Sequence, residues 1–371
     1  MKEIMKFKFS KNYNKIIILI YNFIFLNILL KLKSKYDITY KNRNKNEIKD
    51  KKLKLVNEFI KIYSSLYDVA RDGKAVIPSF SKNYKNQNYK SKKMLGGICI
   101  CVIGKRENLY AKQFVDYYFK LGINKIIIFD NNDIEDENFY EVLKDYVDKK
   151  FIDIVDIRGI NSALYPVYNY CYHQNKDLYD WIAFLDIDEY IYIKNFTNIN
   201  EYLYNKRFEK CQTIFFNWIM YNDNDLTEYD YRPLLERFKN AKKMIDQGKS
   251  FVRGGFDNLI IPTSMLPGIN INYFCNSNGE RIFPPNYLNA EYNNNSMAYI
   301  KHFYTKTAEE FCNKINKGDA QFHKNHPKYL SQIYNKINNF FLFNKRTKKK
   351  LKILGKCLDI NLIKYIDKLK E

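Results

Sequence analysis

The chain has 371 residues, and its 62 lysines and arginines against 41 aspartates and glutamates give a formal net charge of +21. Hydrophobic residues make up 46% of it, which excludes full disorder, while 13 glycines and 8 prolines are too few for a collagen-like or linker-like chain. At about 150 residues per domain, the length suits one large domain or two smaller ones.

The positive charge is concentrated at the two ends of the chain. Residues 1–93 carry a net charge of +16 and residues 343–371 carry +7, whereas residues 94–342 carry −2. An enzyme that acts on nucleic acid would place positive charge around its cleft, so the near-neutral middle argues against a nucleic-acid partner. Two basic ends favour contact with an anionic membrane surface.

Residues 16–30 form an uncharged apolar run with lysines on both sides. The run is shorter than the roughly 20 residues that cross a bilayer comfortably, and no small-residue cleavage site follows it. A short signal anchor, a helix in the membrane interface and a helix buried in the fold are all compatible with it. We expect a membrane-associated protein, with a single membrane span as one alternative and residues 1–93 as its basic anchor and stem.

Strand and helix patterns alternate after residue 96. Short apolar runs predict strands over residues 97–103, 125–129, 151–157 and 181–185. Helical spacing predicts the helices between them, over residues 108–121, 139–147 and 164–173. This alternation with short links is typical of an α/β fold with a mostly parallel sheet flanked by helices on both faces.

Ligands of such sheets bind beyond the carboxyl ends of the strands. A phosphate-binding loop after the first strand is excluded, because Arg106 stands where that loop needs Ser or Thr after its lysine. Asp186 and Asp188 follow the fourth predicted strand directly. Alternate residues of an extended chain project to one side, and carboxylate oxygens are the ligands that hard divalent cations prefer. The pair therefore indicates a metal-assisted site for a phosphorylated substrate.

The seven cysteines show no Cys-x-x-Cys pair. An odd number without metal-site spacing favours buried, reduced thiols. We therefore expect the catalytic part of the chain to lie in the cytoplasm.

The sequence resembles the nucleotide-binding half of GT-A-type glycosyltransferases, within the group around glycosyltransferase families 2 and 92 that includes lipopolysaccharide and capsule enzymes. DWIAFLDIDEYI is one of the matching pieces, and the resemblance covers residues 97 to about 320. The matching segments are 101–133, 180–191, 217–223, 234–238, 249–253 and 300–319.

The resemblance implies a GT-A-like fold and a metal-dependent, hexosyltransferase-like enzyme. It implies a nucleotide-sugar donor, with a UDP-sugar expected, a glycan or lipid-linked acceptor, Mn²⁺ or Mg²⁺ as cofactor, and inversion at the transferred sugar. It divides the chain into an anchor (1–93), a GT-A domain (94–320) and a basic helical extension (321–371). The alternative is a non-catalytic peripheral membrane protein on the same scaffold.

Site residues carry over from the resemblance by position. Asp186 and Asp188 are the implied metal ligands and diphosphate contacts, Asp188 being catalytic, and His302 completes the metal shell. The implied substrate-binding residues are Arg106 and Glu107 for the nucleoside, Asp130 and Asn131 for the base or ribose, and Lys306 for the diphosphate.

Two assignments concern the acceptor side of the site. Inverting transfer needs a carboxylate or a histidine within hydrogen-bond reach of the acceptor hydroxyl. Glu236 is chosen as this base, from the candidates Asp223, Asp225, Glu236 and Asp257. Trp218 is interpreted as a core residue or a wall of the acceptor site.

Overall fold

The computed structural model describes residues 96–159, 164–256, 259, 261, 273–282, 296–317 and 329–357. The apolar run 16–30 and the rest of the predicted anchor, as well as Asp257, lie outside the described residues. Within the described ranges, no helix combines the length and the apolar character needed to cross a membrane.

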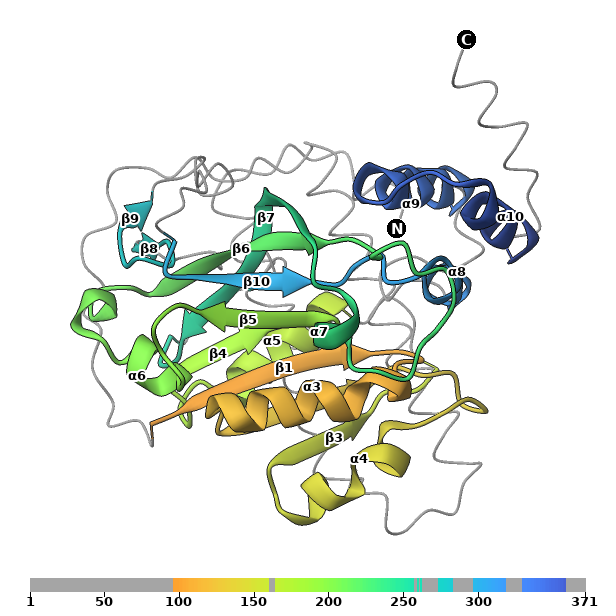
Figure 1. Ribbon diagram of the computed structural model, residues 1–371. Helices are drawn as coiled ribbons and strands as arrows, with labels where there is room; N and C mark the ends of the chain where they lie inside the picture. The colour runs from red at the N-terminus through yellow and green to blue at the C-terminus, as the bar shows by residue number, and fades with distance from the viewer. Residues whose placement is uncertain are drawn as a thin grey trace, which may run out of the picture.

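The described residues form a large mixed sheet with helices on both sides (Figure 1). The strands are β1 (Ile98–Gly104), β2 (Lys125–Asp130), β3 (Ile152–Asp156), β4 (Trp181–Phe184), β5 (Glu189–Ile193), β6 (Thr213–Tyr221), β7 (Ala241–Arg253), β8 (Phe274–Cys275), β9 (Arg281–Ile282) and β10 (Ala298–His302). The helices are α3 (Asn108–Leu121), α4 (Phe139–Asp148), α5 (Leu164–Asn175), α6 (Ile199–Leu203), α7 (Leu234–Arg237), α8 (Ala308–Asn316), α9 (Tyr329–Phe343) and α10 (Lys348–Cys357).

The predicted α/β fold class is confirmed. Strands β3, β2, β1 and β4 lie side by side and parallel, and the helices between them begin and end within two residues of the predicted bounds. Beyond β4 the sheet continues in the order β7, β6, β10 and β5. Strands β6 and β10 run parallel to β4, whereas β7 and β5 are antiparallel to their neighbours.

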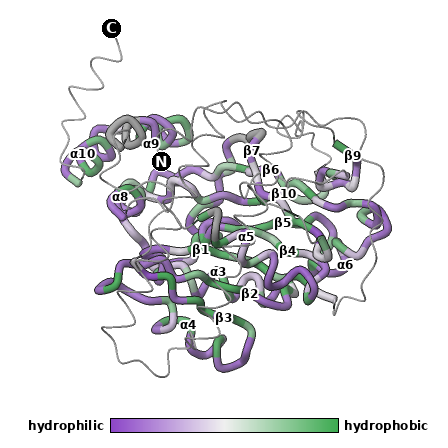
Figure 2. Tube along the Cα trace, turned by 180° about the vertical axis from the view of Figure 1, so that it is seen from behind, coloured by the Kyte–Doolittle hydropathy of each residue, from purple (hydrophilic) through white to green (hydrophobic). Residues whose placement is uncertain are grey.

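The alternation of side chains along β1 separates two parts of the core. Ile98, Ile100 and Val102 face the hydrophobic cluster that contains Phe114 of α3. Cys99, Cys101 and Ile103 face the opposite cluster, which contains the buried tyrosines of α5. Both faces of the parallel strands are therefore covered, as parallel sheets require. Figure 2 shows the hydrophobic residues gathered along these central strands.

The prediction of reduced cysteines is wrong for six of the seven. Disulfides join Cys101 to Cys171, Cys211 to Cys275 and Cys312 to Cys357, and Cys99 is a buried free thiol. The paired residues are 45 to 70 positions apart, so no local spacing signals the pairing. The expectation of a cytoplasmic catalytic domain rested on reduced thiols and loses that support.

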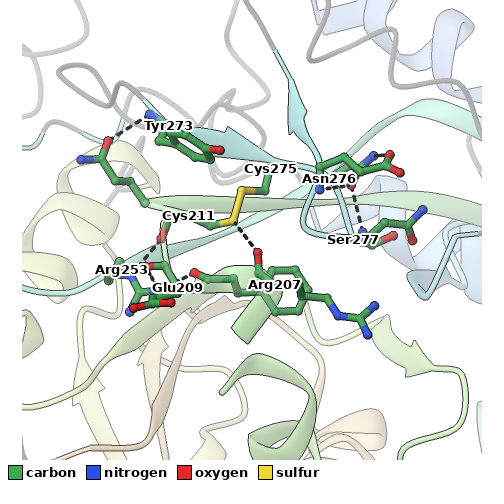
Figure 3. The surroundings of a disulfide bond; sticks show 12 residues. Arg207, Glu209, Cys211, Arg253, Tyr273, Cys275, Asn276 and Ser277 are labelled. Carbon is green, nitrogen blue, oxygen red and sulfur yellow. Dashed lines mark hydrogen bonds between the residues drawn. A yellow bond between two sulfur atoms is a disulfide. The ribbon is translucent and has the colours of Figure 1, made fainter. Parts of the chain in front are cut away.

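The Cys211–Cys275 disulfide ties the start of β6 to β8 (Figure 3). The guanidinium of Arg253 on β7 donates hydrogen bonds to the carbonyl oxygens of Cys211 and Phe208. The backbone N–H of Tyr273 donates to the side-chain oxygen of Gln212. The main chain next to each cysteine of the disulfide is therefore held by hydrogen bonds. The disulfide therefore fixes the sheet at the end remote from the carboxyl end of β4.

Protein isolated under non-reducing conditions and denatured is expected to expose one reactive thiol of seven, because six cysteines are paired. Replacing Cys211 and Cys275 together by serine should lower the free energy of unfolding by about 2–4 kcal/mol, since the bond restricts the unfolded chain. Thiol titration in denaturant and denaturant unfolding check the two effects. Seven reactive thiols without reductant would contradict the pairing.

The carboxyl-terminal helices α9 and α10 pack on α8, the helix that follows β10 (Figure 1). Phe311 of α8, Phe340 of α9 and Leu354 of α10 share one buried cluster. Lys350 of α10 forms a buried ion pair with Asp223, with 2.6 Å between Nζ and Oδ2. This part of the predicted extension is thus attached to the sheet domain by packing, charge and a disulfide, and the predicted division into domains stays a prediction.

Candidate functional site

The Asp186–Asp188 segment is a tight turn between β4 and β5. The backbone N–H of Glu189 donates to the carbonyl of Asp186, and the Glu189 carboxylate accepts from the backbone N–H of Asp186, at 3.0 and 2.9 Å. Asp188 is buried, whereas the side chain of Asp186 is 41% exposed. The turn therefore presents one carboxylate inside the molecule and one at its opening, at the carboxyl end of β4.

Two lysines bind the buried carboxylate of Asp188. The ammonium groups of Lys306 and Lys314 donate to its Oδ2 at 2.9 and 2.8 Å. Lys306 follows β10 and has a φ of 50°, a left-handed conformation that non-glycine residues seldom adopt. Lys314 comes from the last turn of α8. The end of β10 and the helix that follows it thus converge on the aspartate.

A third lysine binds the other aspartate. The ammonium of Lys249 lies 3.0 Å from Oδ2 of Asp186 and 3.5 Å from Oε2 of Glu189. Strand β7 carries it between β4 and β6, and Gly248 precedes it where a Cβ would collide with the carbonyl oxygen of Phe216. The close approach of β7 to β6 at this glycine therefore fixes the start of the Lys249 side chain.

His302, at the end of β10, completes the cluster together with Trp218 of β6. Its Nε2 lies 3.5 Å from Oδ1 of Asp188, and its ring contacts the indole of Trp218 at a tilt of 50°, with 4.5 Å between centroids. Three buried polar atoms here have no hydrogen-bond partner among the described residues: Nδ1 of His302, Nε1 of Trp218 and Oε1 of Glu189. Buried polar groups are normally paired, so these atoms indicate a place for a polar ligand.

The charges of the cluster are shifted by burial and by one another. Burial alone would raise the pKa of Asp188, but the ammonium groups of Lys306 and Lys314 outweigh it and hold that pKa well below its usual range. Burial raises the pKa of Glu189 well above its usual range despite Lys249. Burial lowers the pKa of His302, so its imidazole is neutral at pH 7.

The donor set does not fit the expected Mn²⁺ or Mg²⁺. Among the described residues, no group of three or more His, Cys, Asp or Glu side chains is arranged to hold a metal ion. Oδ2 of Asp188 and Oδ2 of Asp186 already accept hydrogen bonds from ammonium groups. A metal ion held by Asp186, Asp188 and His302 stays a prediction from the resemblance.

The residues expected to hold the nucleoside lie at the carboxyl ends of β1 and β2. Arg106 points to acidic side chains of the next loop and forms ion pairs with Asp133 and Asp136. Glu107 is buried and pairs with Lys317, just after α8, at 2.9 Å. Glu107 therefore lies at the carboxyl end of β1, next to the end of α8.

Asp130 and Asn131, expected to meet the base or ribose, are buried at the end of β2. The carboxylate of Asp130 accepts hydrogen bonds from Asn132 and from the backbone N–H of Phe139, so it fixes the turn that leads into α4. Asn131 donates to the carbonyl of Ile157. These contacts describe a structural role for both side chains, and their expected contact with a nucleotide stays a prediction.

The candidate bases differ in their surroundings. Glu236 is exposed on the short helix α7, whose buried residues are Leu234 and Arg237. Asp223 is buried in its ion pair with Lys350, and Asp225 has a largely exposed side chain. The choice of Glu236 stays a prediction.

Sequence reasoning missed Lys249 and Lys314 as site residues and gave Glu189 no role. In a chain with 62 basic residues, a lysine in a strand or helix carries no distinguishing local signal. Lys306, Glu310 and Lys314 are spaced four residues apart, from just before α8 into its last turn. This spacing does not indicate contact with Asp188.

A model of glycosyltransferase family 92 matches residues 97–338, which is well over half of the chain. A family 92 protein of Ricinus communis is 25% identical over 96 residues, covering 26% of this chain and 17% of that protein. One of Oryza sativa subsp. japonica is 19% identical over 123 residues, covering 31% and 18%. The matches span less than a fifth of these curated relatives.

The similar solved structures include Staphylococcus aureus TarS 1–349. It is 12% identical with a TM-score of 0.31, covering 71% of this chain and 70% of that chain. TarS 1–349 in complex with UDP-GlcNAc is 12% identical with a TM-score of 0.30, covering 70% and 80%. Scores at this level are too low to transfer a ligand or a residue role.

Proposed function

Because the chain belongs to glycosyltransferase family 92, we propose that it transfers a sugar from a nucleotide-sugar donor to an acceptor hydroxyl. In this reaction the acceptor oxygen bonds to the anomeric carbon, the bond from that carbon to the diphosphate oxygen breaks, and the acceptor proton passes to a base. The products are the glycosylated acceptor and a nucleoside diphosphate. The protein must therefore hold the diphosphate and stabilise it as it leaves.

The observation that carries the proposal is the cluster at the carboxyl end of β4. Asp186 and Asp188, three lysines, His302 and Trp218 come from five separate segments and meet where α/β sheets bind their ligands. The unpaired atoms of His302, Trp218 and Glu189 give this place the polar groups that a ligand would satisfy. Burying charged groups costs free energy of folding. Clusters of buried charges with shifted pKa values are typical of binding and catalytic sites.

The finer parts of the proposal come from the resemblance. We propose a UDP-sugar as donor, a glycan or lipid-linked acceptor, and inversion at the transferred carbon, with an anionic membrane surface as the place where the acceptor is met. Trp218, half-buried beside His302, suits the wall of a sugar site, because aromatic faces pack against apolar ring faces.

Incubation of the full-length protein with UDP-, GDP- and TDP-sugars is expected to release the nucleoside diphosphate from one donor class, because glycosyltransferases hydrolyse bound donors slowly without acceptor. Released nucleotide is measured by chromatography, with and without added Mn²⁺. The matched control is heat-denatured protein from the same preparation. If no donor is bound or hydrolysed under any of these conditions, the proposed function is wrong.

A further inference from the structure

We infer that Lys249, Lys306 and Lys314 supply the positive charge that holds the donor diphosphate, in the role that a divalent cation was expected to fill. This inference rests on the proposed transfer reaction and names the groups of the same site that recognise the diphosphate. The three lysines come from β7, from the segment after β10 and from α8. Each ammonium nitrogen lies 2.8–3.0 Å from a carboxylate oxygen of Asp186 or Asp188.

The number of charges supports the inference. Three ammonium groups face the two aspartate carboxylates of Asp186 and Asp188. The carboxylates of a divalent-cation site are balanced by the cation itself, but here lysines already balance them. A divalent cation on Oδ2 of Asp188 would also lie directly beside two ammonium groups, and like charges at that separation repel strongly.

Lysine geometry allows one ammonium to serve two anions. An ammonium group has three N–H donors. Lys314 donates to Asp188 and to the carbonyl of Tyr304, and within the described part of the chain Lys306 donates one hydrogen bond, to Asp188. The aspartates therefore hold the ammonium nitrogens in position while donors remain for phosphate oxygens.

The cluster is open to solvent on the side where a diphosphate would enter. The side chains of Asp186 and Lys314 are 41% and 23% exposed, whereas Lys306 and Lys249 are almost fully buried. Lys314 is thus the most exposed of the three lysines.

Isothermal titration of the full-length protein with UDP, GDP and CDP, in excess EDTA and in Mn²⁺, tests the inference. For the nucleotide that binds, we expect dissociation constants that agree within about threefold between EDTA and Mn²⁺. Lys314→Met should weaken binding about tenfold or more in both buffers, because a charge-assisted contact is lost. Lys314→Arg, which keeps the charge, should recover most of the affinity.

The matched control is Lys349→Met, which removes an exposed lysine of α10 from its ion pair with Glu228 and should leave binding unchanged. Binding that occurs only with Mn²⁺ would overturn the inference and leave the proposed function standing. Absence of binding in both buffers would overturn both. If Lys314→Met fails to fold, the comparison of EDTA with Mn²⁺ on the wild type decides the matter alone.

Discussion

Replacing Asp188 by asparagine is expected to reduce donor turnover by about a hundredfold or more, the range seen when a preorganised polar group of an active site is removed. Asparagine has nearly the same shape, so the change removes the charge and little else. Lys306 and Lys314, which both donate to Oδ2 of Asp188, would then face a neutral amide, and a neutral acceptor holds an ammonium group more weakly than a carboxylate does. Both ammonium groups would turn away from the positions that suit a diphosphate.

The measurement is the rate of nucleotide release from the donor that the wild type accepts, together with the thermal midpoint of each variant. The matched control is Asp153→Asn, since Asp153 is exposed and forms an ion pair with Lys125. Rates should fall for Asp188→Asn at temperatures where its circular dichroism remains native. If folded Asp188→Asn turns over the donor within about threefold of the wild-type rate, the Asp188 carboxylate does not contribute to donor binding or transfer.

Replacing Arg237 by methionine is expected to lower the free energy of unfolding by about 3–5 kcal/mol, because it leaves a carboxylate buried without its partner. Arg237 of α7 and Glu310 of α8 are 1% and 2% exposed, and two hydrogen bonds of 2.8 Å join them. Tyr110 of α3 donates to the same carboxylate at 2.7 Å. The pair therefore ties three helices together beside the site.

Glu310 also forms the capping box that begins α8, with Thr307 as its partner. Burial alone would raise the pKa of Glu310, but Arg237 outweighs it and lowers that pKa. A lowered pKa in the folded state contributes stability that is present above the ordinary glutamate pKa and is lost as the pH falls through the lowered value. The wild type should therefore lose this contribution in acid, and Arg237→Met should show a smaller decline over the same range.

Denaturant unfolding at several pH values measures both effects. Arg232→Met is the matched control, because Arg232 forms an exposed ion pair with Asp230, and exposed pairs contribute little to stability. An Arg237→Met variant as stable as Arg232→Met would contradict the role assigned to the buried pair.

The parallel half of the fold was predictable because its signals are local. The run at residues 125–130 is apolar and rich in β-branched residues, and Gly122 ends the preceding helix in a left-handed conformation. Strands β6, β7 and β10 were not predicted, since their place in the sheet depends on antiparallel pairing between distant residues. Trp181 of β4, for example, pairs with Arg253 of β7.

The candidate site was predictable where position after a strand determines position in space. Asp186 and Asp188 follow β4, a strand that the sequence predicts. His302 and Lys306 were assigned through the resemblance, and they lie at the end of β10 and just after it, close to Asp188. Lys249 comes from an antiparallel strand and Lys314 from the helix beyond β10, and neither follows from the order of the predicted strands. The disulfides were missed for the same reason, since each joins elements far apart in the sequence.

A crystal structure of the full-length protein with the nucleoside diphosphate that it binds tests the central claim most directly. We predict diphosphate density at the carboxyl end of β4, within hydrogen-bond distance of the ammonium groups of Lys306 and Lys314, with the ribose toward the end of β1. Nucleotide density at another place on the molecule, with the hydrogen bonds between Asp188 and its two lysines unchanged, would contradict it.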